Sequence, residues 1–212
     1  MPLAVSHAGF IVTDLIDAIV ANRDHLSEID GKIGDGDHGI NMAKGFTMCR
    51  AALGDPVPGL KESLGILGDT LMGGIGGSMG PLYGTFFSEM AESLDGVATL
   101  DAQAFGTMLR RGMDGVVDIG GAKPGDKTLL DTLAPAIAAF DGALEAGKPF
   151  AACLDDMSSA ARRGRDSTVD MIAKVGRASR LGERSRGVLD AGSASCCVIL
   201  ETMAKSITPE VT

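Results

Sequence analysis

The sequence predicts an all-α protein, because helical periodicity dominates it and convincing strands are missing. Apolar residues recur at steps of three and four, the spacing of one face of a helix. The segments with this spacing are 12–29, 79–94, 102–117, 129–144 and 196–207. The best strand candidate, 115–119, is short and continues a helical phase. We therefore expect eight or nine helices around one core, with a kink at Pro135.

Length and composition limit what the chain can do. At 212 residues, of which 45% are hydrophobic, it suits a single domain over residues 1–212. Its net charge of −9 argues against nucleic acid and against an anionic membrane as partners. We find neither a basic secretory region at the start nor an apolar run near the ~20 residues of a membrane span. The four cysteines fit neither a disulfide framework nor a zinc pattern, so we expect buried thiols in a reducing, cytoplasmic compartment.

The breaks between the predicted helices are unusually long and rich in glycine. The sequence has 30 glycines, and ordinary helix connections need one at most. The four glycine-rich breaks are 30–39, 73–80, 120–128 and 176–187. They indicate that backbone must approach a ligand closely.

Three carboxylates lie close together in the first break. Asp30, Asp35 and Asp37 would repel one another strongly unless a cation lay between them. Their oxygen ligands suit Mg²⁺ or Ca²⁺, although the glycine and closing glutamate of an EF-hand are absent. The alternative is a solvated acidic turn whose aspartates cap helices.

The second break has the composition of an anion site. Its glycines can present successive N–H groups in front of a helix that begins near Met79, with the hydroxyl of Ser78 beside them. Alternatively, the glycines let two helices cross closely.

The last two breaks admit simpler interpretations. Residues 125–128 are not a P-loop, because Asp126 separates glycine from lysine and no strand precedes them, so we expect Asp126 or Thr128 to cap the next helix. The arginines of 176–187 either clamp phosphate or lie in a solvated loop. Of the three histidines, only His38 adjoins the acidic cluster.

Taken together, these breaks resemble one family. Residues 34–41, 76–87, 124–128 and 176–185 are similar, in order, to motifs of the nucleotide-binding L subunit of dihydroxyacetone kinase, the DhaL type. The resemblance runs over essentially the whole chain, and four motifs in register are far more specific than any one of them.

The resemblance implies an antiparallel eight-helix barrel that binds ADP or ATP at one end through two Mg²⁺ ions. It implies that Asp30, Asp35 and Asp37 are the metal ligands and the catalytic residues. The nucleotide-binding residues that it implies are His38, Gly39, Ile40, Asn41, Gly77, Ser78, Gly120, Leu129, Arg177, Asp190, Ala191 and Gly192. The chain departs from the family at Val188, where histidine is frequent, and at Ala191, where proline is frequent.

The resemblance also implies partners and a reaction. A separate K-type subunit would hold dihydroxyacetone, and an M-type phosphocarrier of the phosphotransferase system, or free ATP, would supply the phosphoryl group. Transfer would depend on positioning and charge neutralisation, without a covalent nucleophile on this chain. The alternatives are a kinase subunit for a four-carbon ketose such as erythrulose, and a nucleotide-sensing module that binds a transcription regulator.

Overall fold

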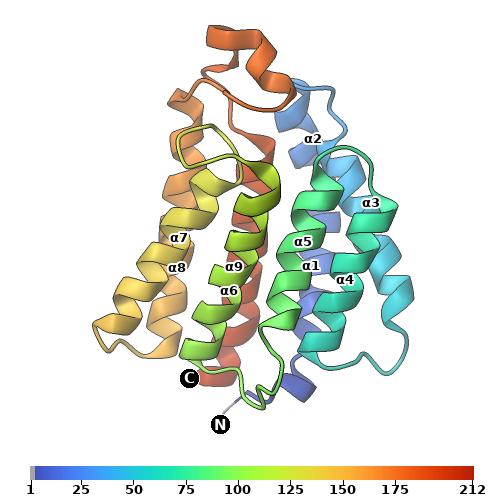
Figure 1. The fold of residues 1–212 in the computed structure, drawn as a ribbon, viewed down its shortest axis with the longest axis vertical. Helices are drawn as coiled ribbons and strands as arrows, with labels where there is room; N and C mark the ends of the chain where they lie inside the picture. Colours follow the sequence, from blue (N-terminus) through green and yellow to red (C-terminus); the bar gives the residue numbers. More distant parts are fainter. Residues whose placement is uncertain (1–2) are drawn as a thin grey trace.

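The computed structural model describes residues 3–212, and helices dominate this part of the chain (Figure 1). The α-helices are α1 (Phe10–Ala21), α2 (Arg23–Gly31), α3 (His38–Leu53), α4 (Leu60–Gly74), α5 (Met79–Glu92), α6 (Ala102–Gly120), α7 (Leu130–Glu145), α8 (Phe150–Ser167) and α9 (Ala191–Val211). Short 3₁₀ helices cover Val5–His7, Thr168–Asp170 and Arg177–Ser185. The strand-like pairing within residues 3–212 is one isolated bridge between Ala4 and Thr99. The all-α prediction is confirmed.

From α2 to α9, successive helices run in opposite directions along the long axis of the molecule (Figure 1). Only Asn22 separates α1 from α2, so these two helices form one interrupted pass. From α3 to α9 each helix contacts the next, and α9 contacts α1. This order of neighbours agrees with eight passes arranged in a ring, while the eight-helix barrel itself remains a prediction.

The core lies between these passes and contains two clusters of aromatic rings. Phe46 and Phe86 both contact the ring of Phe87, with centroids 6.0 and 5.1 Å away. Phe140 and Phe150 lie 5.3 and 5.6 Å from Phe105. Burying one such side chain contributes roughly 2–3 kcal/mol to folding. All four cysteines are buried free thiols, as the sequence predicted.

Two of the predicted segments contain a residue that disturbs regular helix. The apolar stripe of 12–29 is broken at Asn22, whose Nδ2 donates to the carbonyl of Ala18 (2.8 Å). Helix α7 runs through Pro135, which lacks the N–H that would pair with the carbonyl of Asp131. That carbonyl faces Gly164 of α8, where an added Cβ would lie 2.3 Å from it, so the two helices approach closely here.

The longest connection of the described chain lies at the same end of the molecule as the glycine-rich breaks. At one end lie the breaks between α2 and α3, α4 and α5, and α6 and α7, together with residues 168–190, which we call the cap (Figure 1, orange). Both ends of the described chain lie at the opposite end. Within residues 3–212, no helix combines the length and the apolar character that crossing a bilayer requires.

Candidate functional site

A cavity of about 660 Å³ lies at the end of the molecule that carries the cap. All four glycine-rich breaks contribute to its wall, as does the start of α9. The predicted site residues that line it are Asp30, Asp35, Asp37, His38, Asn41, Gly77, Ser78, Gly120, Leu129, Arg177, Asp190, Ala191 and Gly192. Residues predicted separately from four distant motifs therefore meet in one place.

The three acidic side chains converge at one edge of this cavity. Asp30, Asp35 and Asp37 each offer a carboxylate oxygen, and these oxygens all lie within 4.8 Å of one another. Asp37 precedes α3 but makes no capping hydrogen bond with its side chain. The solvated-turn alternative, in which the aspartates cap helices, therefore does not describe Asp37.

Close packing between α2 and α3 fixes the position of the acidic cluster. A Cβ added at Gly39 would lie 1.9 Å from the carbonyl oxygen of Arg23, so only glycine allows this approach. The Ile40 N–H donates to the Ser27 hydroxyl (3.2 Å) on the same side. Gly39 and Ile40, both predicted to contact the nucleotide, do not line the cavity: Gly39 lies beneath α2 and the Ile40 side chain is exposed.

The start of α5 lines the cavity. Ser78 precedes this helix, lines the cavity and makes no capping hydrogen bond with its side chain. Gly77 has φ +76°, and a Cβ at Gly76 or Gly77 would meet nothing within 4 Å. Close packing of two helices therefore does not explain Gly76 or Gly77. It does explain Gly80, where a Cβ would lie 2.4 Å from the Ile75 carbonyl oxygen at the end of α4.

A buried hydrogen-bonded chain forms the floor behind the acidic cluster. His38 Nε2 lies 2.9 Å from the Ser195 hydroxyl, which lies 2.7 Å from the Tyr83 hydroxyl. The Tyr83 hydroxyl also donates to the carbonyl of Gly192 (3.1 Å). Burial lowers the pKa of His38 to about 4, although Asp30 opposes this shift. His38 is therefore a neutral, oriented side chain at neutral pH.

One part of the cavity wall is apolar. It consists of Leu82, Val116, Ile119, Leu129, Leu130 and Val175. Sequence reasoning had assigned only Leu129 to the site. A flat, uncharged group such as a purine base can lie against such a wall while an anionic tail reaches the polar edge.

Side chains hydrogen-bond to the backbone at the starts of two helices beside the cavity. The Asp190 carboxylate accepts from the N–H of Ser193 (2.6 Å) and caps α9, and burial raises the pKa of Asp190 to about 6. Before α7, the Thr128 hydroxyl accepts from Leu130 N–H (3.2 Å), while Asp131 accepts from Thr128 N–H (2.7 Å). Asp126 does not cap α7; its carboxylate accepts from Lys123 N–H (3.0 Å) within the loop.

Of the arginines in the cap, one reaches the cavity. Arg177 lines it and pairs with the Asp35 carboxylate. Arg186 instead pairs with Glu183 and donates to the carbonyl of Asp170 (2.8 Å). The alternative of a solvated loop is therefore right for Arg186, whereas Arg177 joins the cap to the acidic cluster.

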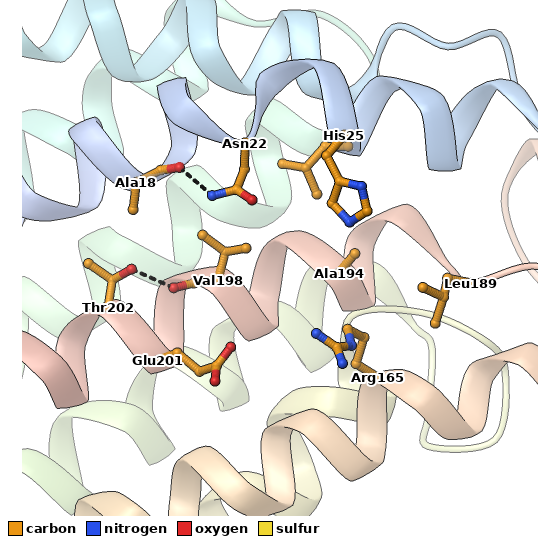
Figure 2. Close-up of a pocket in the computed structure, with 10 residues that line it drawn as sticks. Ala18, Asn22, His25, Arg165, Leu189, Ala194, Val198, Glu201 and Thr202 are labelled. Atoms are coloured by element: carbon orange, nitrogen blue, oxygen red, sulfur yellow. Dashed lines mark hydrogen bonds between the residues drawn. The ribbon is translucent and has the colours of Figure 1, made fainter.

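A second cavity, of about 430 Å³, lies between α1–α2 and α8, over α9 (Figure 2). Its amide and hydroxyl groups are engaged within their own helices: Asn22 Nδ2 donates to Ala18, and the Thr202 hydroxyl donates to the carbonyl of Val198 (2.7 Å). Arg165 pairs with Asp166. Because no predicted site residue lines it, we take the larger cavity as the functional site.

Comparisons with known proteins agree with this choice. The family model described as the DAK2 domain matches residues 32–205. This chain belongs to the DAK2 domain family. This DAK2 domain is 37% identical, over 89% of its length and 90% of the relative's, to the ADP-binding subunit DhaL of the PEP-dependent dihydroxyacetone kinase of Escherichia coli. It is 36% identical to the corresponding subunit of kinase 2 of Listeria innocua, over 94% of its length and 95% of the relative's.

Solved structures support the same family. The dihydroxyacetone kinase of C. freundii in complex with AMP-PNP and Mg²⁺ aligns with a TM-score of 0.68 and 26% identity, over 97% of the DAK2 domain and 35% of that kinase. The chain thus spans about a third of the C. freundii protein. The resemblance stated from the sequence is confirmed, whereas the role of each site residue remains a prediction.

Proposed function

We propose that this chain is the ADP-binding L subunit of a dihydroxyacetone kinase. In this role it binds ADP or ATP with Mg²⁺ and presents the terminal phosphoryl group to dihydroxyacetone. The observation that carries the proposal is the meeting of three carboxylates with the free start of α5 at one cavity. The DhaL relatives, which match along nearly their whole length, support it.

The donor set at the acidic cluster fits Mg²⁺. It consists of carboxylate oxygens alone, close enough to share a cation, with no thiol or imidazole among the three. Asp30, Asp35 and Asp37 would hold the metal, which supplies charge neutralisation for the phosphate groups when bound. The same three carboxylates would repel a polyphosphate without it, so metal and nucleotide should bind together.

The remaining groups of the cavity bind and orient the nucleotide. The N–H groups at the start of α5 and the Ser78 hydroxyl face the phosphates, where a helix N-terminus favours negative charge. The apolar wall takes the base. Arg177, once it leaves Asp35, adds a bidentate cation for phosphate or stacks on the base. The chain contributes positioning and electrostatics, which is what phosphoryl transfer requires.

A K-type subunit holding dihydroxyacetone and an M-type phosphocarrier complete the proposed reaction. The names of the bacterial relatives support this arrangement, since each is one subunit of a PEP- or PTS-dependent kinase. Relatives named as erythrulose kinases are 29–31% identical, and the chain covers only 33–34% of each. We therefore favour dihydroxyacetone over a four-carbon ketose.

The test has two stages. Calorimetry with the purified chain should show ADP binding that depends on Mg²⁺ and disappears with EDTA. Adding a K-type subunit, an M-type phosphocarrier, the general phosphotransferase proteins and phosphoenolpyruvate should then yield dihydroxyacetone phosphate. Absence of ADP binding in the presence of Mg²⁺ would refute the proposal. ADP binding without product, together with capture of a transcription regulator, would favour the sensing role.

A further inference from the structure

Lys127 is a buried cation whose role the proposed chemistry leaves open. Only 2% of the residue is exposed, although lysine is almost never fully buried without a partner. Among residues 3–212 it is also the only residue other than glycine that has a positive φ (62°). A lysine keeps this left-handed conformation only where its surroundings require it.

The ammonium group of Lys127 is satisfied entirely by backbone carbonyls of the cap. Nζ donates to the carbonyl oxygens of Met171 (3.2 Å), Ser185 (2.5 Å) and Val188 (2.7 Å). A lysine ammonium has three donors, and these three partners use all of them. Because the carbonyls come from both ends of the cap, one side chain ties the beginning of the cap to its end.

The loop that presents Lys127 is hydrogen-bonded to the first turn of α7. Asp131, in the first turn of α7, accepts from the N–H groups of Gly125 (2.5 Å) and Thr128 (2.7 Å). A second, exposed connection joins the same loop to the cap: Lys174 N–H donates to the carbonyl of Asp126 (3.1 Å), and Lys174 Nζ to that of Gly125 (2.7 Å). Helix α7 therefore holds the loop, and the loop holds the cap.

The cap in turn carries groups of the site. Val175, Gly176, Arg177 and Ala178 line the cavity, and Arg177 pairs with Asp35 across its mouth. The cap ends at Asp190, where α9 and the Ala191–Gly192 wall begin. The position of these groups depends on where the cap is fixed.

We propose that Lys127 is a positioning residue that fixes the cap over the cavity and thereby sets how long a nucleotide stays bound. That the retained ligand is a nucleotide rests on the proposed function. That Lys127 anchors the cap rests only on the hydrogen bonds between Lys127 and the cap. Lys127 is not assigned to the transferred group, because its donors are all occupied by carbonyls.

The test compares Lys127→Met with Lys123→Met. Methionine approximates the length of lysine but has no donors, and Lys123 is an exposed lysine of the same loop, so both variants lose one charge. In the nucleotide-free protein, hydrogen exchange should be at least ten times faster in residues 168–190 of Lys127→Met, while α3 to α7 keep wild-type protection. Lys123→Met should match the wild type throughout.

The second readout is the rate at which a fluorescent ADP analogue leaves the Mg²⁺-loaded protein when chased with ADP. We expect at least a tenfold faster rate for Lys127→Met and an unchanged rate for Lys123→Met. This rate does not depend on the fraction of protein that is folded. A lysine that only stabilises the fold would lower the yield of binding-competent protein and leave the rate at its wild-type value.

The outcomes separate the two proposals. Wild-type exchange of the cap in Lys127→Met, or faster exchange spread evenly over all helices, would overturn the anchoring. An unchanged dissociation rate with a loosened cap would overturn its link to nucleotide retention. Failure of the wild-type protein to bind the analogue with Mg²⁺ would overturn the proposed function, and with it that link, while the exchange experiment would still decide the anchoring.

Discussion

The two ends of the molecule differ in how their polar groups are paired. At the end that carries the termini, backbone groups pair closely: Leu100 N–H donates to Leu3 (2.8 Å), and the Asp101 carboxylate caps α6 at Ala104 N–H (2.8 Å). At the cavity end, three carboxylates lie together and the start of α5 has no side-chain cap. The first end is arranged for stability, and the second keeps unfavourable groups that a ligand could satisfy.

The largest effect should follow from removing a metal ligand at the cavity end. Asp37→Asn keeps the shape of the side chain but removes its charge, and we expect the affinity for ADP with Mg²⁺ to fall about 100-fold or more. Thermal stability without nucleotide should stay the same or rise, because repulsion within the cluster is reduced. Calorimetry and thermal denaturation measure the two quantities. Asp155→Asn, on the exposed face of α8, is the control, and equal ADP affinities would remove Asp37 from the metal site.

A change at the opposite end should reverse this pattern. A Cβ in Gly9→Ala would lie 1.9 Å from the Pro58 carbonyl oxygen, so the free energy of unfolding should fall by about 3 kcal/mol. The ADP affinity of the folded protein should be unchanged. Gly142→Ala, whose Cβ meets nothing within 4 Å in α7, should be neutral or stabilising. Urea denaturation checks this, and a loss of ADP affinity in folded Gly9→Ala would show that the two ends are coupled.

A third change, Asp190→Asn, shows how a buried carboxylate at the cavity end makes the free energy of unfolding depend on pH. Burial raises the pKa of Asp190 to about 6, above the 3.8 of an unfolded chain, so the folded state binds this proton more tightly. As the pH rises from about 4 to about 6, the wild type should therefore lose about 2 kcal/mol of unfolding free energy relative to Asp190→Asn. The asparagine oxygen can still accept from Ser193 N–H. Urea denaturation of the nucleotide-free protein at several pH values should show this divergence, and parallel curves would contradict it.

The smallest effect on stability should come from exposed ion pairs, which are alike at both ends. Arg177 pairs with Asp35 at the cavity, and Lys61 pairs with Asp95 at the far end. Arg177→Met and Lys61→Met should each change the unfolding free energy by less than about 1 kcal/mol. Only Arg177→Met should weaken ADP binding, by roughly tenfold, a charge-assisted hydrogen bond being worth about 1.5 kcal/mol. Equal affinities in both variants would remove Arg177 from the nucleotide site.

The sequence predicted the helices with uninterrupted apolar stripes better than the others. Helices α5, α6 and α7 lie within a few residues of the predicted segments. Helix α3 contains Gly39 and Gly45, whose missing side chains leave room for neighbouring elements, so its apolar pattern is diluted. The apolar segment 196–207 covers only the later part of α9, because the first turn of this helix is set by the Asp190 cap rather than by periodicity.

The same distinction holds for the site. The three carboxylates are close to one another in sequence, as are the glycines within each break, so their spacing already allowed a metal and an anion site, which the family resemblance then favoured. The His38–Ser195 contact joins residues 157 positions apart, and the three partners of Lys127 lie 44 to 61 positions away from it. No local pattern encodes such contacts; they exist only once the helices are packed.

Both ends of the described residues, 3–212, lie away from the cavity, and this has a practical consequence. Helix α9, with 21 residues, is about 30 Å long and separates Thr212 from the cap. A tag, a surface tether or a second folded module joined at that terminus would leave the mouth open to small molecules and to other proteins. The fold is thus suited to immobilisation, and to fusion with other modules in a longer polypeptide, without blocking access to the cavity.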